Sequence, residues 1–335
     1  MRFEEFKDAA ERILTKAENP LFIFDDDPDG LCSYLLLRRA YQKGSGMVVK
    51  TSPHLTMQFL PRIEKAHADC IVILDIANVD QELIDALNRP IIWIDHHSLA
   101  DIERVLYYNP IAHGLERSTA EITYDLVGRD AWIALIGAVS DYRVPETIDR
   151  KYPDLIPERT DSPDHFMYES RTGELVRIFA FALKGMPDEA IASADILLDI
   201  EGPYELLEAS ERTRALREKY EALEKEYTSV RDDALSQIGE DRVFVYVYTT
   251  NGYSMTTELA NELSYRYPSR LIIIARLARG AYRMSIRCRE HPVREALEHA
   301  LRHVRGGGGG HLHACGAHVH EEDFEIFIDA LSERF

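Results

Sequence analysis

The sequence has no long hydrophobic run, and none of its apolar stretches approaches the ~20 residues that a helix needs to cross a bilayer. The first segment, Met1 to Lys16, mixes acids and lysines with apolar residues at helical spacing, which predicts an amphipathic helix and not a secretory signal. Cysteine is also scarce and forms no CxxC pair. We therefore expect a cytoplasmic protein with reduced thiols, and neither a disulfide framework nor a zinc site, at Cys32, Cys70, Cys288 and Cys315.

Basic residues are few relative to acids: the sequence has 39 lysines and arginines and 58 aspartates and glutamates, which gives a net charge of −19. A protein this acidic should repel long nucleic acids unless its basic groups cluster locally. They do cluster between Arg266 and Arg305, where ten arginines and no lysines accompany three acids, a local charge of +7. This segment is either an ordinary solvated surface or an anion-binding face on a second domain.

With 335 residues, the chain is long for one core and comfortable for two. Short runs rich in Ile, Val and aromatics predict buried strands in the first part of the chain, at Leu21–Phe24, Cys70–Leu74, Ile91–Ile94 and, more weakly, Met47–Thr51. Helical patterns lie between and after these strands, at Ser33–Tyr41, Gln81–Leu87, Ser118–Val127 and Ala131–Val139. Strands that alternate with helices predict an α/β fold, with a parallel sheet covered by helices on both faces.

The middle of the chain predicts a surface connection over Pro145–Glu174, because that segment is polar and rich in Pro, Asp and Arg. A helix over Glu174–Ala194, broken near Gly185, and a long linker helix over Tyr204–Asp233 follow. A second domain begins near Asp241. Its predicted strands are Val243–Tyr248, Leu271–Ala275 and Tyr282–Arg287, and its predicted helices are Thr257–Tyr265 and Glu321–Arg334.

Four carboxylates follow the first predicted strand within five residues, in the stretch Asp25-Asp26-Asp27-Pro28-Asp29-Gly30. The alternate residues Asp25, Asp27 and Asp29 can converge on one side of a tight loop, and they repel one another unless cations neutralise them. The alternatives are a solvated acidic turn or a calcium loop. A calcium loop is disfavoured, because a strand precedes the segment and no Glu stands at loop position twelve.

Three more clusters of carboxylate or imidazole end apolar runs. Asp75 ends the second predicted strand, Asp95-His96-His97 follows the third, and Asp141 closes the run Ile136–Ser140. Ligands of open parallel sheets bind beyond the carboxyl ends of the strands, so these side chains are expected to meet there. Carboxylate with imidazole suits Mn²⁺, Fe²⁺ or Mg²⁺, and two such ions clamp a phosphoryl group and activate a water.

A glycine run near the C-terminus, Gly306–Gly310, leads into His311 and small residues up to Gly316. Glycines leave the backbone N–H groups accessible to a phosphate. A flexible linker is the alternative, but the small residues that continue after His311 favour closely packed backbone.

In chain order these residues read Asp-x-Asp-x-Asp-Gly, a lone Asp, Asp-His-His, a lone Asp and Gly-Gly-Gly-His. The combination resembles the DHH phosphoesterases with a C-terminal DHHA1 domain, which include RecJ-type exonucleases, nanoRNases and cyclic-dinucleotide phosphodiesterases. The resemblance covers nearly the whole chain from about Leu21, and the combination is highly specific although each piece is weak. It implies a DHH catalytic domain over residues 1–190, a helical linker over 191–238 and a smaller α/β DHHA1 substrate-binding domain over 239–335.

The resemblance also implies roles for single residues. It implies two Mn²⁺ ions, with Mg²⁺ or Fe²⁺ as alternatives, bound by Asp25, Asp27, Asp29, Asp75, His96 and Asp141. Asp75 would bridge the ions, Asp95 would support His96, and His97 would touch the substrate phosphate. In the second domain, Ser285 and Arg287 resemble the Ser-x-Arg strand with Arg287 on a phosphate, and the substrate-end pocket would consist of Gly308, Gly309, Gly310 and His311. The catalytic cleft would then lie between two domains.

Two departures refine this expectation. Many members that cleave oligonucleotides or dinucleotides carry His where this chain has Ile23, whereas RecJ-type members use the alternating aspartates found here. Bacterial RecJ-type enzymes also carry a further nucleic-acid-binding domain, and this sequence has no such segment after Phe335. The first feature favours the RecJ-type exonuclease branch, and the second favours the compact archaeal relatives or the minimal two-domain hydrolases. Asp26 has no family role.

The sequence therefore predicts a Mn²⁺-dependent phosphodiesterase that removes nucleotides from the end of single-stranded DNA or RNA, or from short oligonucleotides. One alternative is a hydrolase of a small phosphate compound, such as a cyclic dinucleotide or pyrophosphate, which the −19 charge favours. Another is a non-catalytic replication or repair subunit, which the retained carboxylates disfavour. No membrane partner is expected, and the long helix over Tyr204–Asp233 leaves a homodimer open.

Overall fold

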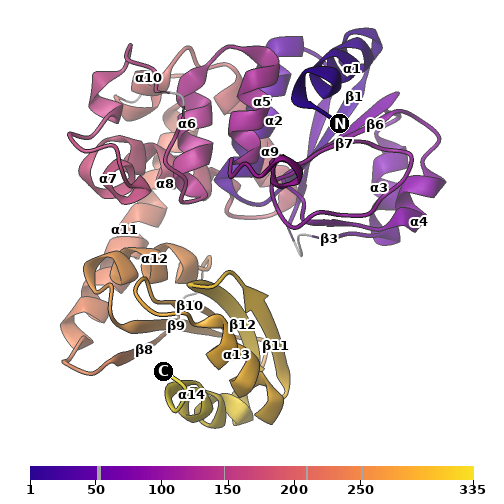
Figure 1. Ribbon diagram of the computed structural model, residues 1–335. Helices are drawn as coiled ribbons and strands as arrows, with labels where there is room; N and C mark the ends of the chain where they lie inside the picture. Colours follow the sequence, from indigo (N-terminus) through magenta and orange to yellow (C-terminus); the bar gives the residue numbers. More distant parts are fainter. Residues whose placement is uncertain (51–53, 147, 209, 250–251) are drawn as a thin grey trace. The chain divides into compact units, whose positions relative to one another are not determined.

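The computed structural model describes residues 1–50, 54–146, 148–208, 210–249 and 252–335 (Figure 1). The chain divides into two compact units, Met1–Glu221 and Ala222–Phe335. In the described parts, no helix combines the length and the apolar character that a membrane span requires.

A five-stranded parallel sheet forms the centre of the first unit. Its strands have the order β2-β1-β4-β6-β7, with bounds Ser45–Val49 (β2), Pro20–Asp25 (β1), Cys70–Leu74 (β4), Ile91–Ile94 (β6) and Leu106–Tyr108 (β7). Both faces of the middle strands are buried, which is why they read as continuous apolar runs. The predicted α/β class is confirmed. β7 was not predicted, and Thr51 of the weak strand prediction lies outside the described residues.

Helices cover the two faces of this sheet (Figure 1). On one face, Ile71, Ile73 and Trp93 belong to a core that includes Ile63 and Leu83, from α3 (Leu60–Lys65) and α4 (Gln81–Ala86). The opposite face contacts α2 (Pro28–Tyr41) and α5 (Thr119–Val127), and α6 (Ala131–Ser140) packs against both of these helices. The predicted amphipathic N-terminal helix is α1 (Phe3–Lys16), which packs against β7.

A helical layer continues the first unit through α7 (Pro163–Glu169), α8 (Thr172–Leu183), α9 (Pro187–Leu198) and α10 (Pro203–Leu207). The predicted break near Gly185 is confirmed between α8 and α9. The prediction of a surface connection over Pro145–Glu174 is wrong, because Tyr152, Leu155 and Phe166 are buried there. Their spacing among prolines and acids is too sparse to produce a helical period in the sequence.

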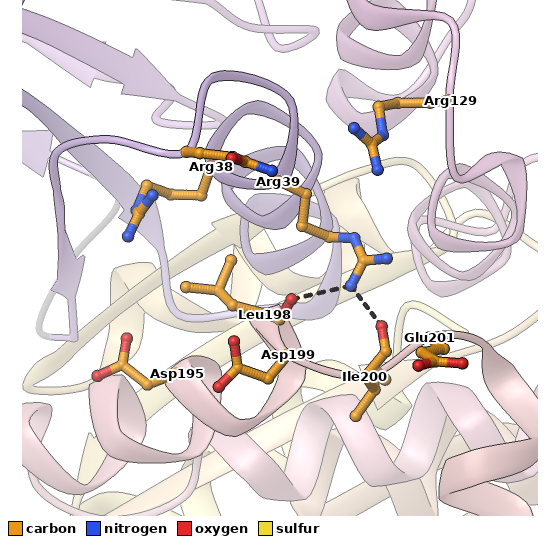
Figure 2. A pocket seen from close by; sticks show the side chains of 9 residues that line it. Arg38, Arg39, Arg129, Asp195, Leu198, Asp199, Ile200 and Glu201 are labelled. Atoms are coloured by element: carbon orange, nitrogen blue, oxygen red, sulfur yellow. Dashed lines mark hydrogen bonds between the residues drawn. The ribbon is translucent and has the colours of Figure 1, made fainter.

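The C-terminal end of α2 is anchored by Arg39 (Figure 2). Its guanidinium donates two hydrogen bonds to the Asp130 carboxylate, at 3.0 and 3.1 Å, and others to the carbonyls of Leu198 and Ile200 at the end of α9. A cation is favourable at a helix C-terminus.

A polar cavity of about 600 Å³ lies at this end of α2, lined by Arg38, Arg39, Gln42, Arg129, Asp195, Leu198, Asp199, Ile200 and Glu201. The clustered aspartates lie at the other end of α2.

The second unit contains a mixed five-stranded sheet of order β11-β12-β10-β9-β8, in which β8 and β9 are parallel and the other neighbours are antiparallel. Its elements are β8 (Val243–Tyr248), α12 (Thr256–Arg266), β9 (Leu271–Ala278), β10 (Ala281–Arg287), α13 (Arg294–Ala300), β11 (Gly306–Gly310), β12 (Ala314–His320) and α14 (Phe324–Ser332). The glycine run is therefore a strand, and not a flexible linker.

The helix α11 (Arg214–Gln237) contains the division between the two units. The sequence predicts one long helix over Tyr204–Asp233, but α10 ends at Leu207 and α11 begins at Arg214. In the segment between these helices, the hydroxyls of Ser210 and Thr213 donate hydrogen bonds back to Glu205 of α10, at 3.1 and 3.2 Å. Short polar side chains of this kind compete with helical hydrogen bonds, which explains the interruption.

Candidate metal centre

Four polar residues follow one aligned row of the parallel sheet. Phe24, Leu74, Ile94 and Tyr108 are register partners across β1, β4, β6 and β7. The next residues along these strands are Asp25, Asp75, Asp95 and Asn109. The register thus brings three predicted site residues to one edge of the sheet, as expected for the carboxyl ends of parallel strands. Asn109 was not predicted.

The acidic loop joins this edge to the first turn of α2. Asp27 caps α2 and accepts a hydrogen bond from the Gly30 N–H at 2.9 Å. A Cβ on Gly30 would lie 2.9 Å from the backbone N and O of Asp25, so this turn requires glycine. Asp29 is buried, and its carboxylate accepts from the N–H groups of Thr119 and Ala120 at 2.8 and 3.0 Å. These are the first amides of α5, an anion-binding position by charge and geometry.

The ring of His96 lies between two of the predicted ligands. Its Nε2 is 3.2 Å from Asp75 Oδ1 and its Nδ1 is 3.4 Å from Asp141 Oδ2. Thr119 Oγ1 also donates to Asp75 Oδ1, at 2.9 Å. Asp141 follows the helix α6 and not a strand, and a carboxylate at a helix C-terminus is unfavourable without a compensating cation.

The pKa values in this cluster reflect buried like charges. Burial, and then the charge of Asp27, raise the pKa of Asp25 to about 7. Burial also raises the pKa of Asp29 to about 7 and that of Asp75 well above its ordinary value. Burial alone would lower the pKa of His96, but the hydrogen bond and the charge of Asp75 outweigh it and raise that pKa to about 11. In the metal-free protein, a protonated His96 partly offsets the charge of these carboxylates, and it must release a proton before its ring can bind a cation.

The donor set fits a divalent cation. Asp75 Oδ2 and His96 Nδ1 are buried and have no hydrogen-bond partner among the described residues. Ligand atoms of Asp75, His96 and His97 lie within 4.8 Å of one another. Two polar atoms left without partners in a buried carboxylate cluster are what a bound cation would satisfy.

His97 is oriented by Asp95, and this corrects one expectation. Asp95 is fully buried, and its carboxylate accepts from His97 Nδ1 at 2.8 Å and from the His97 backbone N–H at 3.0 Å. It was expected to support His96. β6 ends at Ile94, and the Asp95 carboxylate accepts from the N–H two residues on, as in an Asx turn, which explains why Asp95 meets His97. Asn109 Nδ2 donates to the His97 carbonyl at 2.8 Å and completes the turn.

Two basic residues at this site were missed from the sequence. Arg143 Nε lies 3.2 Å from Asp141 Oδ2, the same oxygen that faces His96, and its Nη1 contacts Glu116 at 3.0 Å. Lys50 follows β2 and contacts Asp26 Oδ1 at 2.6 Å. Asp26, which had no assigned role, is thus ion-paired and does not belong to the carboxylate cluster.

In the second unit, the predicted substrate residues lie on neighbouring strands. Gly309, Gly316 and Ser285 form one cross-strand row. Arg287 lies beside this row, donating to Asn261 Oδ1 at 2.7 Å and to the Cys315 carbonyl at 2.8 Å. Of the other predicted residues, Gly308 and Gly310 lie in β11, and His311 begins the turn to β12 with its N–H bonded to the Ala314 carbonyl.

Comparisons with known proteins match this architecture. The DHH family, N-terminal domain, matches residues 21–156, and the DHHA1 domain matches residues 241–335. A search of curated protein sequences found no match. RecJ from Thermus thermophilus in complex with Mn²⁺ is 16% identical, with a TM-score of 0.64, over 99% of this chain and 55% of that one. The chain thus spans little more than half the length of that protein.

Two other solved structures match over nearly their whole length. An exonuclease RecJ bound to manganese is 17% identical, with a TM-score of 0.64, over 98% of this chain and 93% of that one. The pGpG-specific phosphodiesterase PggH from Vibrio cholerae is 14% identical, with a TM-score of 0.52, over 94% and 98%. At these identities, the structures share the fold with this chain. With both family domains present in order, the chain belongs to the DHH/DHHA1 superfamily, whose members are metal-dependent phosphoesterases.

Proposed function

We propose that this protein is a divalent-cation-dependent phosphodiesterase that releases nucleotides from the end of single-stranded DNA or RNA, or from short oligonucleotides. The observation that carries the proposal is the convergence of Asp75, His96 and Asp141, with two buried polar atoms that lack partners among the described residues. Such a site favours a cation over a simple ion pair, because a buried charge without a partner is costly.

The residues proposed to hold the cations are those of the carboxylate cluster: Asp25, Asp27, Asp29, Asp75, His96 and Asp141. Oxygen and imidazole donors suit Mn²⁺, with Mg²⁺ or Fe²⁺ as alternatives. Two bound ions would neutralise the phosphate and lower the pKa of the attacking water. Both ions have precedent in this fold, since RecJ of T. thermophilus was solved with Mn²⁺ and with Mg²⁺.

His97 and Arg143 are proposed to contact the phosphate. Burial alone would lower the pKa of His97, but the hydrogen bond and charge of Asp95 outweigh it and raise that pKa. The imidazole is therefore held with Nδ1–H on Asp95, which leaves Nε2 to face a substrate oxygen. Arg143 carries a fork of donors suited to a phosphate, and its bond to the exposed Glu116 is weak enough to exchange.

In the second unit, Ser285, Arg287 and the glycines of β11 are proposed to bind the end of the substrate. Gly309 supports this role, because no atom of the described residues lies within 4 Å of the position that a Cβ would occupy. A ligand can therefore approach this backbone closely.

A second candidate is hydrolysis of a linear or cyclic dinucleotide. The net charge of −19 and the full-length match to the fold of a pGpG-specific phosphodiesterase favour this alternative. A non-catalytic protein would be expected to have lost residues of the carboxylate cluster, and all of them are present in this chain.

The proposal is tested by incubating the native protein with labelled DNA and RNA of two to twenty nucleotides, and with linear and cyclic dinucleotides, in Mn²⁺ or EDTA. We expect Mn²⁺-dependent release of mononucleotides, abolished in Asp141→Ala. Asp26→Asn, a change in the acidic loop outside the cluster, should retain most of the activity. If the native protein releases no product from any of these substrates, the proposed function is wrong.

A further inference from the structure

The two faces of the sheet in the second unit are covered to different extents. One face contributes Leu271, Ile273 and Ile286 to a core closed by residues of α13 and α14, including Leu297 and Phe327. The opposite face contacts α12 over β9 and β10 (Figure 1). The part of that face over β12 and β11 is open, since Gly309, Gly316, His318 and His320 are exposed.

A basic row crosses this open face. Arg283 of β10, His318 of β12 and Gly307 of β11 are register partners. Arg283 lies two and four residues from Ser285 and Arg287 on the same strand, and alternation therefore puts all three on one face. The His318 ring covers Gly307, because its Cε1 is 3.0 Å from where a Cβ on that glycine would lie.

The charge of Arg283 is not neutralised locally, unlike that of several neighbours. Arg266 pairs with Glu262 at 2.6 Å, Arg294 with Glu298 at 3.0 Å, and Arg305 with Asp323 at 2.8 Å. The exposed Arg283 makes no hydrogen bond or ion pair with any residue that the structure describes. The strands β10, β11 and β12 also contain no acid. Within the arginine-rich segment, Arg283 is thus a positive charge that is exposed on the open face and available to a ligand.

We propose that Arg283 and His318 bind a backbone phosphate of a single-stranded oligonucleotide, beyond the nucleotide that lies at Ser285 and Arg287. This inference rests on the proposed function and narrows its substrate class. Arg283 and Arg287 are four residues apart on one strand, or about 13 Å. The Arg287 guanidinium is held on Asn261 and on the Cys315 carbonyl, which fixes the phosphate that it can contact. Arg283 is therefore expected to contact a different phosphate, and the row should contribute most to strands longer than a dinucleotide. The imidazole of His318 also offers a flat surface to an unstacked base.

The test compares kcat/KM for oligonucleotides of two, three, five and ten nucleotides, in DNA and in RNA, for native protein and Arg283→Ala. We expect the ratio of kcat/KM between ten and two nucleotides to fall about tenfold, as for loss of one charge-assisted contact. The salt dependence of binding to the ten-nucleotide strand should also weaken by about one unit of slope. His318→Ala should change the ratio in the same direction.

Arg294→Ala is the matched control, since this exposed arginine lies on α13, which packs against the other face, and pairs with Glu298. It should leave the length ratio unchanged. An unchanged ratio in Arg283→Ala, or an equal loss in Arg294→Ala, would overturn the inference. The proposed function fails separately, when the native protein cleaves no oligonucleotide. In that case, binding of a labelled, uncleaved ten-nucleotide strand to the same variants still decides the role of Arg283.

Discussion

Arg143 lies beside the carboxylate cluster, although its sequence neighbourhood does not indicate such a position. It follows Asp141 by two positions in a loop with no recognisable motif. In the structure, its guanidinium touches the Asp141 carboxylate at 3.2 Å and the exposed Glu116 at 3.0 Å. It therefore brings a permanent positive charge to the Asp141 side of the carboxylate cluster. Such a charge can stabilise the negative charge that develops on a phosphate during its transfer.

We expect Arg143→Gln to lower kcat by about one hundredfold, the effect of removing one donor aimed at developing charge. Mn²⁺ affinity, measured by calorimetry, should change little, because glutamine keeps the metal ligands intact. Glu116→Gln is the control and should leave kcat nearly unchanged. If Mn²⁺ affinity falls in step with kcat in Arg143→Gln, the arginine positions Asp141 and does not contact the phosphate.

At the scale of single elements, β11 differs from an ordinary edge strand. It consists only of glycine, and the space available for a side chain alternates between tight and more open positions along the strand. A Cβ on Gly308 would lie 2.5 Å from the Gly316 carbonyl oxygen, whereas the position on Gly309 is open. The strand thus requires glycine at Gly308 for its pairing with β12. At Gly309, glycine leaves room for a ligand.

This alternation predicts different outcomes for two neighbouring substitutions. Gly308→Ala should lower the Tm of the protein by about 5–10 °C, because the new methyl group meets backbone that cannot move aside. Gly309→Ala should leave the Tm within about 1 °C and should weaken oligonucleotide binding instead. Thermal unfolding and binding of a labelled strand measure the two effects. Equal changes in Tm would contradict the alternation.

At the scale of the whole molecule, the carboxylate cluster makes the stability of this acidic protein depend on pH. Asp25 and Asp29 have pKa values of about 7, well above the ordinary carboxyl value, because they are buried among like charges. In the metal-free protein, the folded state therefore holds protons that the unfolded chain releases. This contribution to stability is full below about pH 4 and is lost as the pH rises through about 7.

Metal binding must displace these protons, so the affinity for Mn²⁺ should increase between about pH 6 and pH 8. Thermal unfolding with EDTA and with Mn²⁺ measures this: the increase in Tm caused by Mn²⁺ should be larger at pH 8 than at pH 6. The Asp75→Asn variant should show little increase at either pH. An increase of the same size at both pH values in the native protein would argue against proton displacement.

The sequence by itself determined the α/β class, the buried strands Cys70–Leu74 and Ile91–Ile94, and the positions of Asp75 and His96 after them. Hydrophobic runs and the residues that end them are local signals, so one chain segment is enough to read them. The order of the acidic and histidine clusters likewise pointed to the family before any fold was known.

Only the tertiary structure decided which side chains meet. Thr119 donates to Asp75 because α5 packs against the sheet. Asn109 follows the same row as Asp95 because parallel register joins strands that are far apart in the chain. The strand formed by Gly306–Gly310 depends in the same way on its pairing with β12. Contacts of this kind arise from packing between distant segments, which leaves no periodic signal within either one.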